Sequence, residues 1–334
     1  MNKLNHTRGT GHWLQAGKLI LAVSALATCL HGYAQDKYPS RPIRMVLGSG
    51  AGGLADVTTR EMGQKLGERL GQAVVIDNKP GAGGITATQS VATSAPDGYT
   101  LMVMVTGNTI AKSLLKSLPY DLEKDFVPIT SVAFFDVLAL VKNDSPLKTI
   151  DDLRALGAKK PGGINIGTTS TGSVQNLTAH LFASQAGVKT SIIPYKTSGD
   201  VLIALIRGDV DLGFDAYTSL KSGVDSHQIR PIGSSGSVRS AVLPAVPTMK
   251  ELGLKNFEVI GWNSVFAPAG TPPAVVTLLN KQINEIVALP EVRKKFIEMG
   301  ADPKAGTPQE MAKLFKQNID MFAEVIRTAG IETQ

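Results

Sequence analysis

The feature of this sequence that most constrains its fold is a glycine-rich turn between an apolar run and a helical pattern. Residues 44–56 read RMVLGSGAGGLAD and hold four glycines in six positions, from Gly48 to Gly53. Because glycine has no Cβ atom, a ligand can approach this backbone closely. The helix that follows begins with unpaired N–H groups and the positive end of its dipole. The turn therefore predicts a cradle for a small anion.

A second turn of this kind lies in residues 164–173, INIGTTSTGS, again before apolar residues at helical spacing. Two units of strand, small-residue loop and helix are typical of a cleft between two α/β lobes, at the carboxyl ends of their strands. Strands and helices alternate along the chain, which favours a parallel, doubly wound sheet. We expect residues 137–141 and 257–267 to cross between the lobes, residues 126–128 to be a link, and residues 106–108 to be a loop at the sheet edge.

Residues 1–34 have the pattern of an export signal. Three basic residues precede or open an apolar run at 19–30, small residues follow at 32–34, and no acidic residue occurs before Asp36. Removing the signal would leave about 300 residues, enough for two domains of ordinary size. Two alternatives stay open, a membrane anchor and a lipoprotein processed at Cys29.

The remaining composition argues against several classes of protein. Cys29 is the only cysteine, so the mature chain has no disulfide, no thiol nucleophile and no cysteine-bound metal. Beyond the signal only His180 and His227 remain, a poor basis for a metal site or a Ser-His-Asp triad. Losing three basic residues lowers the net charge from +6 to about +3, too little to indicate a nucleic-acid partner. We expect no metal, no cofactor and no catalysis.

One enzyme class is the alternative. Gly48, Gly50 and Gly53 form a G-x-G-x-x-G pattern after a strand, and Asp77 ends the next strand, as in an NAD-dependent oxidoreductase. Against this alternative, Asp56 would put a carboxylate in the helical turn that should receive a pyrophosphate. An exported chain would also meet little soluble nicotinamide cofactor.

Five further side chains have two interpretations each. Asp56 either stabilises its helix through the dipole or shapes the cradle. Asp215 either forms a turn at the end of a strand or lines the cleft. Tyr195, Tyr217 and Trp262 are either aromatics of the core or rim, or ligand contacts.

Nine short motifs follow one another along the chain after the signal. They are YPSRPIR at 38–44, GG-x-x-D at 52–56, NKPGAGG at 78–84, PDGYT at 96–100, LPYD at 118–121, PYK at 194–196, FD at 214–215, FAPAGTP at 266–272 and AGI at 329–331. Together they resemble the Bug family, the TctC-like substrate-binding proteins of tripartite tricarboxylate transporters.

The resemblance implies a periplasmic binding protein of type II-like fold, with two doubly wound α/β lobes, a central cleft and two crossover segments. Lobe 1 would comprise residues 35–138 and 259–334, and lobe 2 residues 139–258. Such a protein is a monomeric receptor that binds a small carboxylate and delivers it to membrane permease subunits. By position, the residues expected to line the cleft are Ser49, Gly52, Gly53, Asp56, Thr106, Gly107, Asn108, Thr169, Thr171, Gly172, Ser173, Tyr195, Thr197, Asp215 and Tyr217.

One departure from the family pattern bears on the ligand. Gly48 and Ser49 stand where the family usually has Pro-Phe, and Tyr217 stands where a smaller aliphatic residue is usual. The space left by the absent aromatic is either refilled by Tyr217 or taken by the ligand. In the second case we expect a ligand bulkier than a four-carbon dicarboxylate, such as an aromatic carboxylate.

Overall fold

The structure is a computed structural model that describes residues 38–81 and 84–333. The chain divides by its contacts into two units, residues 1–40 and 41–334, and the helices and strands below all lie in the second. The expected export signal at 1–34, with Cys29, lies outside the described residues. Within the described ranges no helix combines the length and apolar character needed to cross a membrane. The same ranges contain no group of three or more His, Cys, Asp or Glu residues that could hold a metal.

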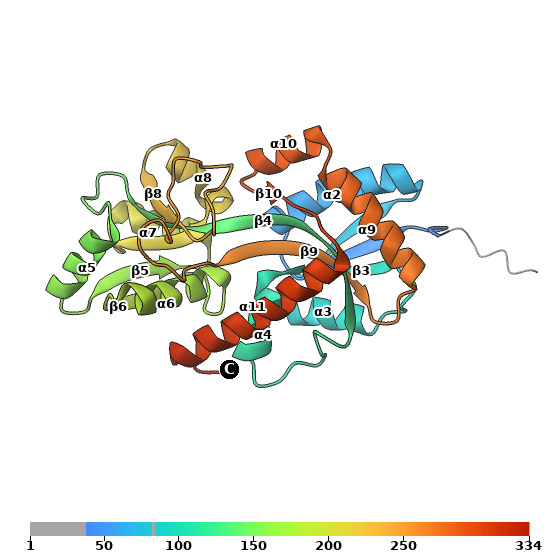
Figure 1. Ribbon diagram of the computed structural model, residues 1–334, viewed down its shortest axis with the longest axis horizontal. Helices are drawn as coiled ribbons and strands as arrows, with labels where there is room; N and C mark the ends of the chain where they lie inside the picture. Colours follow the sequence, from blue (N-terminus) through green and yellow to red (C-terminus); the bar gives the residue numbers. More distant parts are fainter. Residues whose placement is uncertain (1–37, 82–83, 334) are drawn as a thin grey trace, which may run out of the picture. The chain divides into compact units, whose positions relative to one another are not determined.

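Three parallel strands form the first part of the sheet, toward the blue end of the chain in Figure 1. The elements here are β1 (Ile43–Leu47), β2 (Val74–Asn78), β3 (Thr100–Val105), α2 (Leu54–Leu70) and α3 (Ile85–Ala92). The central strand β1 is apolar and almost wholly buried, as expected of a parallel strand with helices on both faces. Helix α2 ends at Gly71, whose φ of 67° is in the left-handed region that favours glycine.

Two long strands, β4 (Phe126–Lys142) and β9 (Ile260–Pro268), continue the sheet. Strand β9 runs antiparallel between β3 and the first part of β4. The last part of β4 pairs antiparallel with β7 and β8 of the second half. The expectation of a parallel sheet therefore fails at the crossing strands. The link expected at 126–128 is also wrong, because these residues begin β4, where Pro128 sits at a register shift that tolerates its missing N–H.

The second half of the sheet repeats the arrangement of the first. Its strand order after β4 is β7-β5-β6, with β7, β5 and β6 parallel, and β8 pairs with β4. Its elements are α5 (Ile150–Lys159), β5 (Ile164–Thr168), α6 (Val174–Ala186), β6 (Thr190–Pro194), α7 (Ser198–Arg207), β7 (Leu212–Ala216), α8 (Tyr217–Asp225) and β8 (Ile229–Ser234). The carboxyl ends of β5 and β7 carry the second cradle and Asp215.

The last part of the chain is mainly helical and joins both halves. It comprises α9 (Pro273–Val287), α10 (Pro290–Glu298), the short β10 (Asp302–Pro303) and α11 (Pro308–Thr328). In Figure 1, α11 (red) runs along both halves. Its beginning, with Met311 and Phe315, packs in the core of the first half, and its end, with Phe322 and Ile326, packs in the core of the second. The sequence analysis did not anticipate this bridge.

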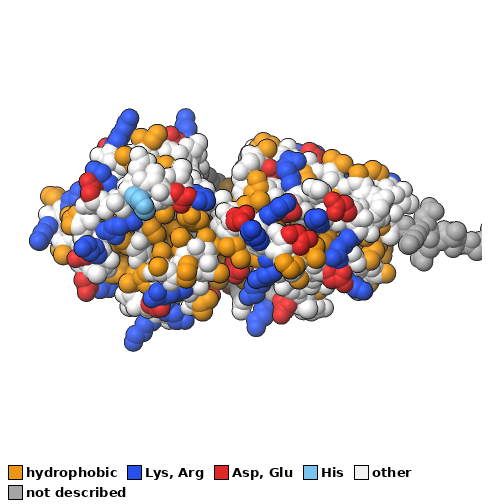
Figure 2. All heavy atoms as spheres, turned by 90° about the horizontal axis from the view of Figure 1, so that it is seen from above, with side chains coloured by type: hydrophobic (Ala, Val, Ile, Leu, Met, Phe, Trp, Pro, Cys, Tyr) orange, Lys and Arg blue, Asp and Glu red, His pale blue; other side chains and the backbone are white. Residues whose placement is uncertain are grey.

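Charged side chains are mixed on the face shown in Figure 2. Lysine and arginine alternate with aspartate and glutamate over both halves of that face. This distribution agrees with the small net charge expected for the mature chain.

Candidate functional site

The first glycine-rich turn is an open loop at the carboxyl end of β1. Gly52 and Gly53 are exposed, and α2 begins after Gly53 without a side-chain cap, so its first N–H groups have no partner of that kind. Gly48 lies backbone to backbone with Gly84: a Cβ added to Gly48 would lie 2.6 Å from Gly84 Cα. A side chain at position 48 would therefore collide with the backbone at Gly84.

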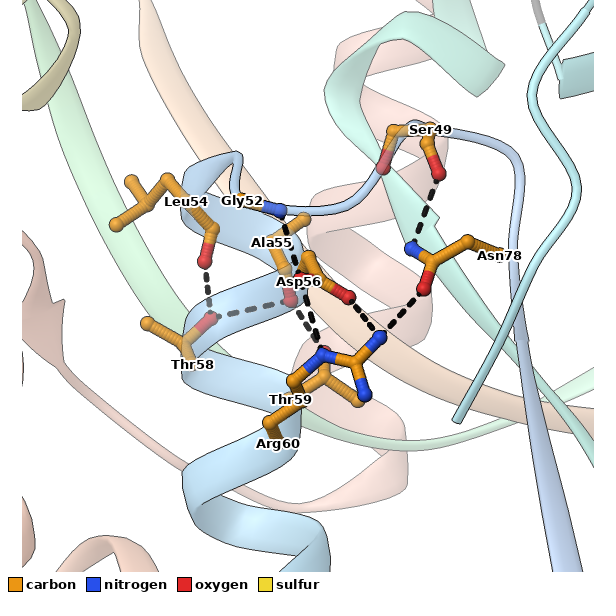
Figure 3. A network of polar contacts seen from close by, with 9 residues as sticks. All are labelled: Ser49, Gly52, Leu54, Ala55, Asp56, Thr58, Thr59, Arg60 and Asn78. Carbon is orange, nitrogen blue, oxygen red and sulfur yellow. Dashed lines mark hydrogen bonds and ion pairs between the residues drawn. The ribbon is translucent and has the colours of Figure 1, made fainter. Parts of the chain in front are cut away.

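A network of polar contacts shapes this loop (Figure 3). The buried Asp56 carboxylate accepts hydrogen bonds from the Gly52 N–H at 2.8 Å and from Arg60 Nε at 3.0 Å. Arg60 Nη2 donates to Asn78 Oδ1 at 2.7 Å, and Asn78 Nδ2 donates to the carbonyl of Ser49 at 3.1 Å. These contacts support the interpretation in which Asp56 shapes the cradle.

The same contacts weigh against a dinucleotide at this loop. Burial acts to raise the pKa of Asp56, but the hydrogen bonds of the network, Arg60 foremost, hold that pKa below its ordinary value. A charged carboxylate thus occupies the first turn of α2, where a pyrophosphate would have to bind. Asp77, the acid that follows the glycine pattern in the oxidoreductase alternative, lies in ion pairs with Arg44 at 3.5 Å and Lys79 at 3.6 Å.

The residues after β3 form the first turn of α4 (Thr106–Leu114) and not the expected loop. The buried Thr106 hydroxyl accepts a 2.8 Å hydrogen bond from the backbone of β9. The buried Asn108 carbonyl oxygen accepts a 2.8 Å bond from the N–H of Val105, which caps the helix. Both side chains are therefore used inside the fold, and Gly107 is the partly exposed residue between them.

The second turn places hydroxyl groups at the N-terminus of α6. Ser173 Oγ accepts from the N–H of Asn176 at 3.1 Å and from the Thr169 hydroxyl at 3.0 Å. A hydroxyl has two acceptor positions and one donor, so Ser173 keeps its own O–H to donate. The exposed Thr171 hydroxyl makes no hydrogen bond within the described part of the chain. Two hydroxyl donors are thus left for an acceptor.

A cavity of about 610 Å³ separates this loop from α4. Its lining residues are Ile85, Gly107, Ile110, Ala111, Leu114, Leu115, Ser170, Thr171, Gly172 and Ser173. Gly172 touches the opposite wall: its φ is +78°, and a Cβ there would lie 2.2 Å from Leu114 Cδ2. The cavity brings four of the expected residues together, namely Gly107, Thr171, Gly172 and Ser173.

Asp215 ends β7 and is fully buried. Its Oδ1 accepts from the N–H of Ala216 at 2.7 Å and from Gln175 Nε2 at 3.1 Å. No hydrogen-bond donor among the described residues contacts Oδ2. Burial raises the pKa of Asp215, and the nearby Ser198 hydroxyl offsets part of that rise.

The three remaining expected residues do not line the cavity. Thr197 caps α7, with its hydroxyl accepting from the N–H of Asp200 at 3.2 Å. Tyr195 packs against the apolar cluster between β4, β7 and α7. Tyr217 donates its hydroxyl to Asp225 at 3.1 Å on its own helix.

Sequence reasoning missed two groups of residues at this site. Arg60 and Asn78 support the first loop through contacts between segments far apart in the chain, which no local pattern reveals. Ile110 and Leu114 form the apolar wall on α4. Their spacing of four residues is helical, but the preceding TGNT run has the composition of a turn and concealed the helix.

The chain is similar to known proteins along most of its length. The sequence model described as Tripartite tricarboxylate transporter family receptor matches residues 58–331. Protein BugT of Bordetella pertussis is 34% identical over 317 residues, which cover 93% of this chain and 97% of that protein.

Two solved structures are similar in fold and sequence. An R. palustris protein with adipate has a TM-score of 0.79 at 31% identity, over 88% of this chain and 99% of its own. MatC from Rhodopseudomonas palustris with bound malate has a TM-score of 0.74 at 29% identity, over 86% and 100%. These likenesses confirm the α/β fold expected of a type II-like periplasmic binding protein.

Proposed function

The chain belongs to the receptor family of the tripartite tricarboxylate transporters, the Bug family, and from this premise we propose that it captures a small carboxylated metabolite for such a transporter. It acts in the periplasm after export directed by residues 1–34, as a monomer that binds without catalysis. Its partners are the membrane permease subunits to which it delivers the ligand.

One observation carries this proposal: Ser173 and Thr171 present O–H donors at the N-terminus of α6, beside a cavity. A carboxylate offers only acceptors, and the start of a helix favours negative charge. The nearest arginine of the first loop, Arg60, is already paired with Asp56. We infer that backbone N–H groups and hydroxyls hold the carboxylate, without an arginine fork.

The expected cleft residues divide into two roles under this proposal. Those proposed to contact or approach the ligand are Ser49, Gly52, Gly53, Gly107, Thr171, Gly172 and Ser173. Those proposed to position the loops are Asp56, Thr106, Asn108, Thr169, Thr197 and Asp215. Tyr195 and Tyr217 belong to the rim or core of the second half.

The proposal is tested by thermal shift and calorimetry with mono-, di- and tricarboxylates on wild type and Thr171→Val. A ligand that binds the folded state raises the melting temperature by mass action. Because the Thr171 hydroxyl has no internal partner, the substitution should leave the unliganded melting temperature unchanged. We expect it to weaken carboxylate binding by about 1 to 2 kcal/mol, the contribution of one hydrogen bond to a charged group.

Thr277→Val is the matched control, since Thr277 is exposed on α9 and does not line the cavity. Its affinity should equal that of wild type. Suppose that Thr171→Val leaves carboxylate affinity unchanged and Arg60→Ala abolishes carboxylate binding. That result would contradict the proposal that hydroxyls and backbone N–H groups hold the carboxylate. If the protein binds NAD saturably and no carboxylate raises its melting temperature, the oxidoreductase alternative would be favoured over the receptor proposal.

A further inference from the structure

The two walls of the cavity beside α6 differ in chemistry. The loop wall consists of Gly172 and the hydroxyl residues Ser170, Thr171 and Ser173. Among the described residues, the wall on α3 and α4 consists of Gly107 and the aliphatic side chains of Ile85, Ile110, Ala111, Leu114 and Leu115. A ligand that fills the cavity therefore meets donors on one side and hydrocarbon on the other.

The polar residues of α4 do not alter this contrast: Thr106, Asn108, Thr109 and Lys112 have partners elsewhere, and Ser113 does not line the cavity. Asn108 bonds to the backbone at Val105, and the buried Thr109 hydroxyl donates to the carbonyl of Thr106 at 2.7 Å. Lys112 forms an ion pair with Glu123. None of these side chains lines the cavity.

The next inference rests on the proposed function. The geometry points to a carboxylate ligand whose remaining part, its body, is an unsubstituted hydrocarbon, in a molecule of about six carbons or more. One carboxylate would lie on the hydroxyl wall and the methylenes or ring on the α4 wall. The second carboxylate of a dicarboxylate would lie toward the first glycine-rich loop, at Gly52 and Gly53. A hydroxyl on that body would lose its water and find no partner among aliphatic side chains, which is unfavourable. Each buried methylene instead gains affinity, by up to about fourfold.

The test compares dicarboxylates by titration calorimetry on the mature protein, without the signal. Succinate, glutarate and adipate extend the body by one methylene at a time, and galactarate is adipate with a hydroxyl on each inner carbon. We expect affinity to rise from succinate to adipate, and adipate to exceed galactarate on the order of tenfold or more. The inference would be overturned if galactarate bound as tightly as adipate or more tightly, or if malate did so relative to succinate. The proposal of a carboxylate receptor would still stand in that case.

Leu115→Ala tests the wall itself. Leu115 lines the cavity but belongs to none of the buried core clusters, so its truncation should spare the fold. We expect a several-fold loss for adipate and a smaller loss for succinate. Ile203→Ala is the matched control, because Ile203 is 48% exposed on α7 and does not line the cavity.

The outcomes separate the two proposals. If affinity rises from succinate to adipate by the same factor in Leu115→Ala as in wild type, the hydrocarbon does not lie on the α4 wall. If no carboxylate of either kind raises the melting temperature, the receptor proposal itself fails, and the inference fails with it.

Discussion

Asp136 is a carboxylate whose surroundings oppose its charge. It lies partly buried on β4, where the Ser234 hydroxyl donates to it at 2.7 Å. Burial raises the pKa of Asp136, and the negative charges of Asp302 and Glu258 raise it further, against the lowering effect of Ser234. Because the unfolded chain ionises this group more readily, its charge costs stability at neutral pH.

We predict that Asp136→Asn stabilises the protein at pH 7. The folded state binds the Asp136 proton more tightly than the unfolded state, so the wild type gains stability from this group as the pH falls through the raised folded pKa. The advantage of the variant should therefore shrink on acidification and vanish below the pKa of an unfolded aspartate, about 3.9. Urea unfolding from pH 7 to pH 4 measures this difference, and a constant difference would contradict it.

Glu251→Gln supplies the opposite case on the same surface. The N–H of Thr248 bonds to Glu251 and holds its pKa below the ordinary value, against a small effect of burial, with Arg239 adding to the lowering. A lowered pKa contributes stability above the unfolded value and loses it as the pH falls. This variant should therefore be destabilised at pH 7, with the loss disappearing at low pH.

At the scale of elements, the loop before α6 and helix α4 meet through Gly172 and Leu114. Gly172→Ala should destabilise the fold by roughly 1 kcal/mol or more, because it adds strain at φ +78° and a collision with Leu114. The collision should make the effects of Gly172→Ala and Leu114→Ala non-additive, with a double mutant more stable than their sum predicts. Denaturant unfolding of the four proteins measures this coupling.

Gly187→Ala is the control for that comparison of single and double mutants. Gly187 caps the end of the same helix at φ +64° with open space around it, so its substitution adds strain without a collision. It should show no coupling to Leu114→Ala. Equal coupling for both glycines would mean that the contact between the loop and α4 does not matter to stability.

The elements with strong local signals are the ones that sequence could predict. Strand β1 and helix α2 follow from an apolar run and a glycine stop, and α5 follows from its capping residue Thr149. Helix α4 and the first part of β4 were missed, because their local residues favour turns. Partners distant in the chain override that preference: β9 pairs with β4, and α11 packs on α4.

The same distinction holds for the site. The glycine pattern predicted the two turns that follow β1 and β5, which the structure contains. Their role as cradles for a ligand stays a prediction. The inward orientation of the Thr106 and Asn108 side chains could not be predicted. Thr106 bonds to β9, and Asn108 caps the helix that these residues begin. The apolar wall depends on α4, and it was missed with that helix.

At the scale of the whole molecule, β4 and α11 run through both halves of the described chain, and β9 begins where the chain returns to the first half. We propose that the halves close on the ligand by bending at the two crossing strands, with α11 limiting the amplitude. Small-angle scattering should show a smaller radius of gyration with saturating ligand than without it. An unchanged radius under saturation, with matched ionic strength as the control, would count against closure.

The length of β4 also bears on how the halves can be separated. Its 17 residues pair with β9 at one end and with β7 and β8 at the other, in one uninterrupted strand. A gene cut between residues 138 and 139 would leave 13 residues of β4 in one fragment and four in the other. Strands β9 and β7 would then keep backbone N–H and C=O groups without their partners. The halves are thus not interchangeable modules. Heat should melt them together, and a recombined receptor would need to inherit the whole of β4 from one parent.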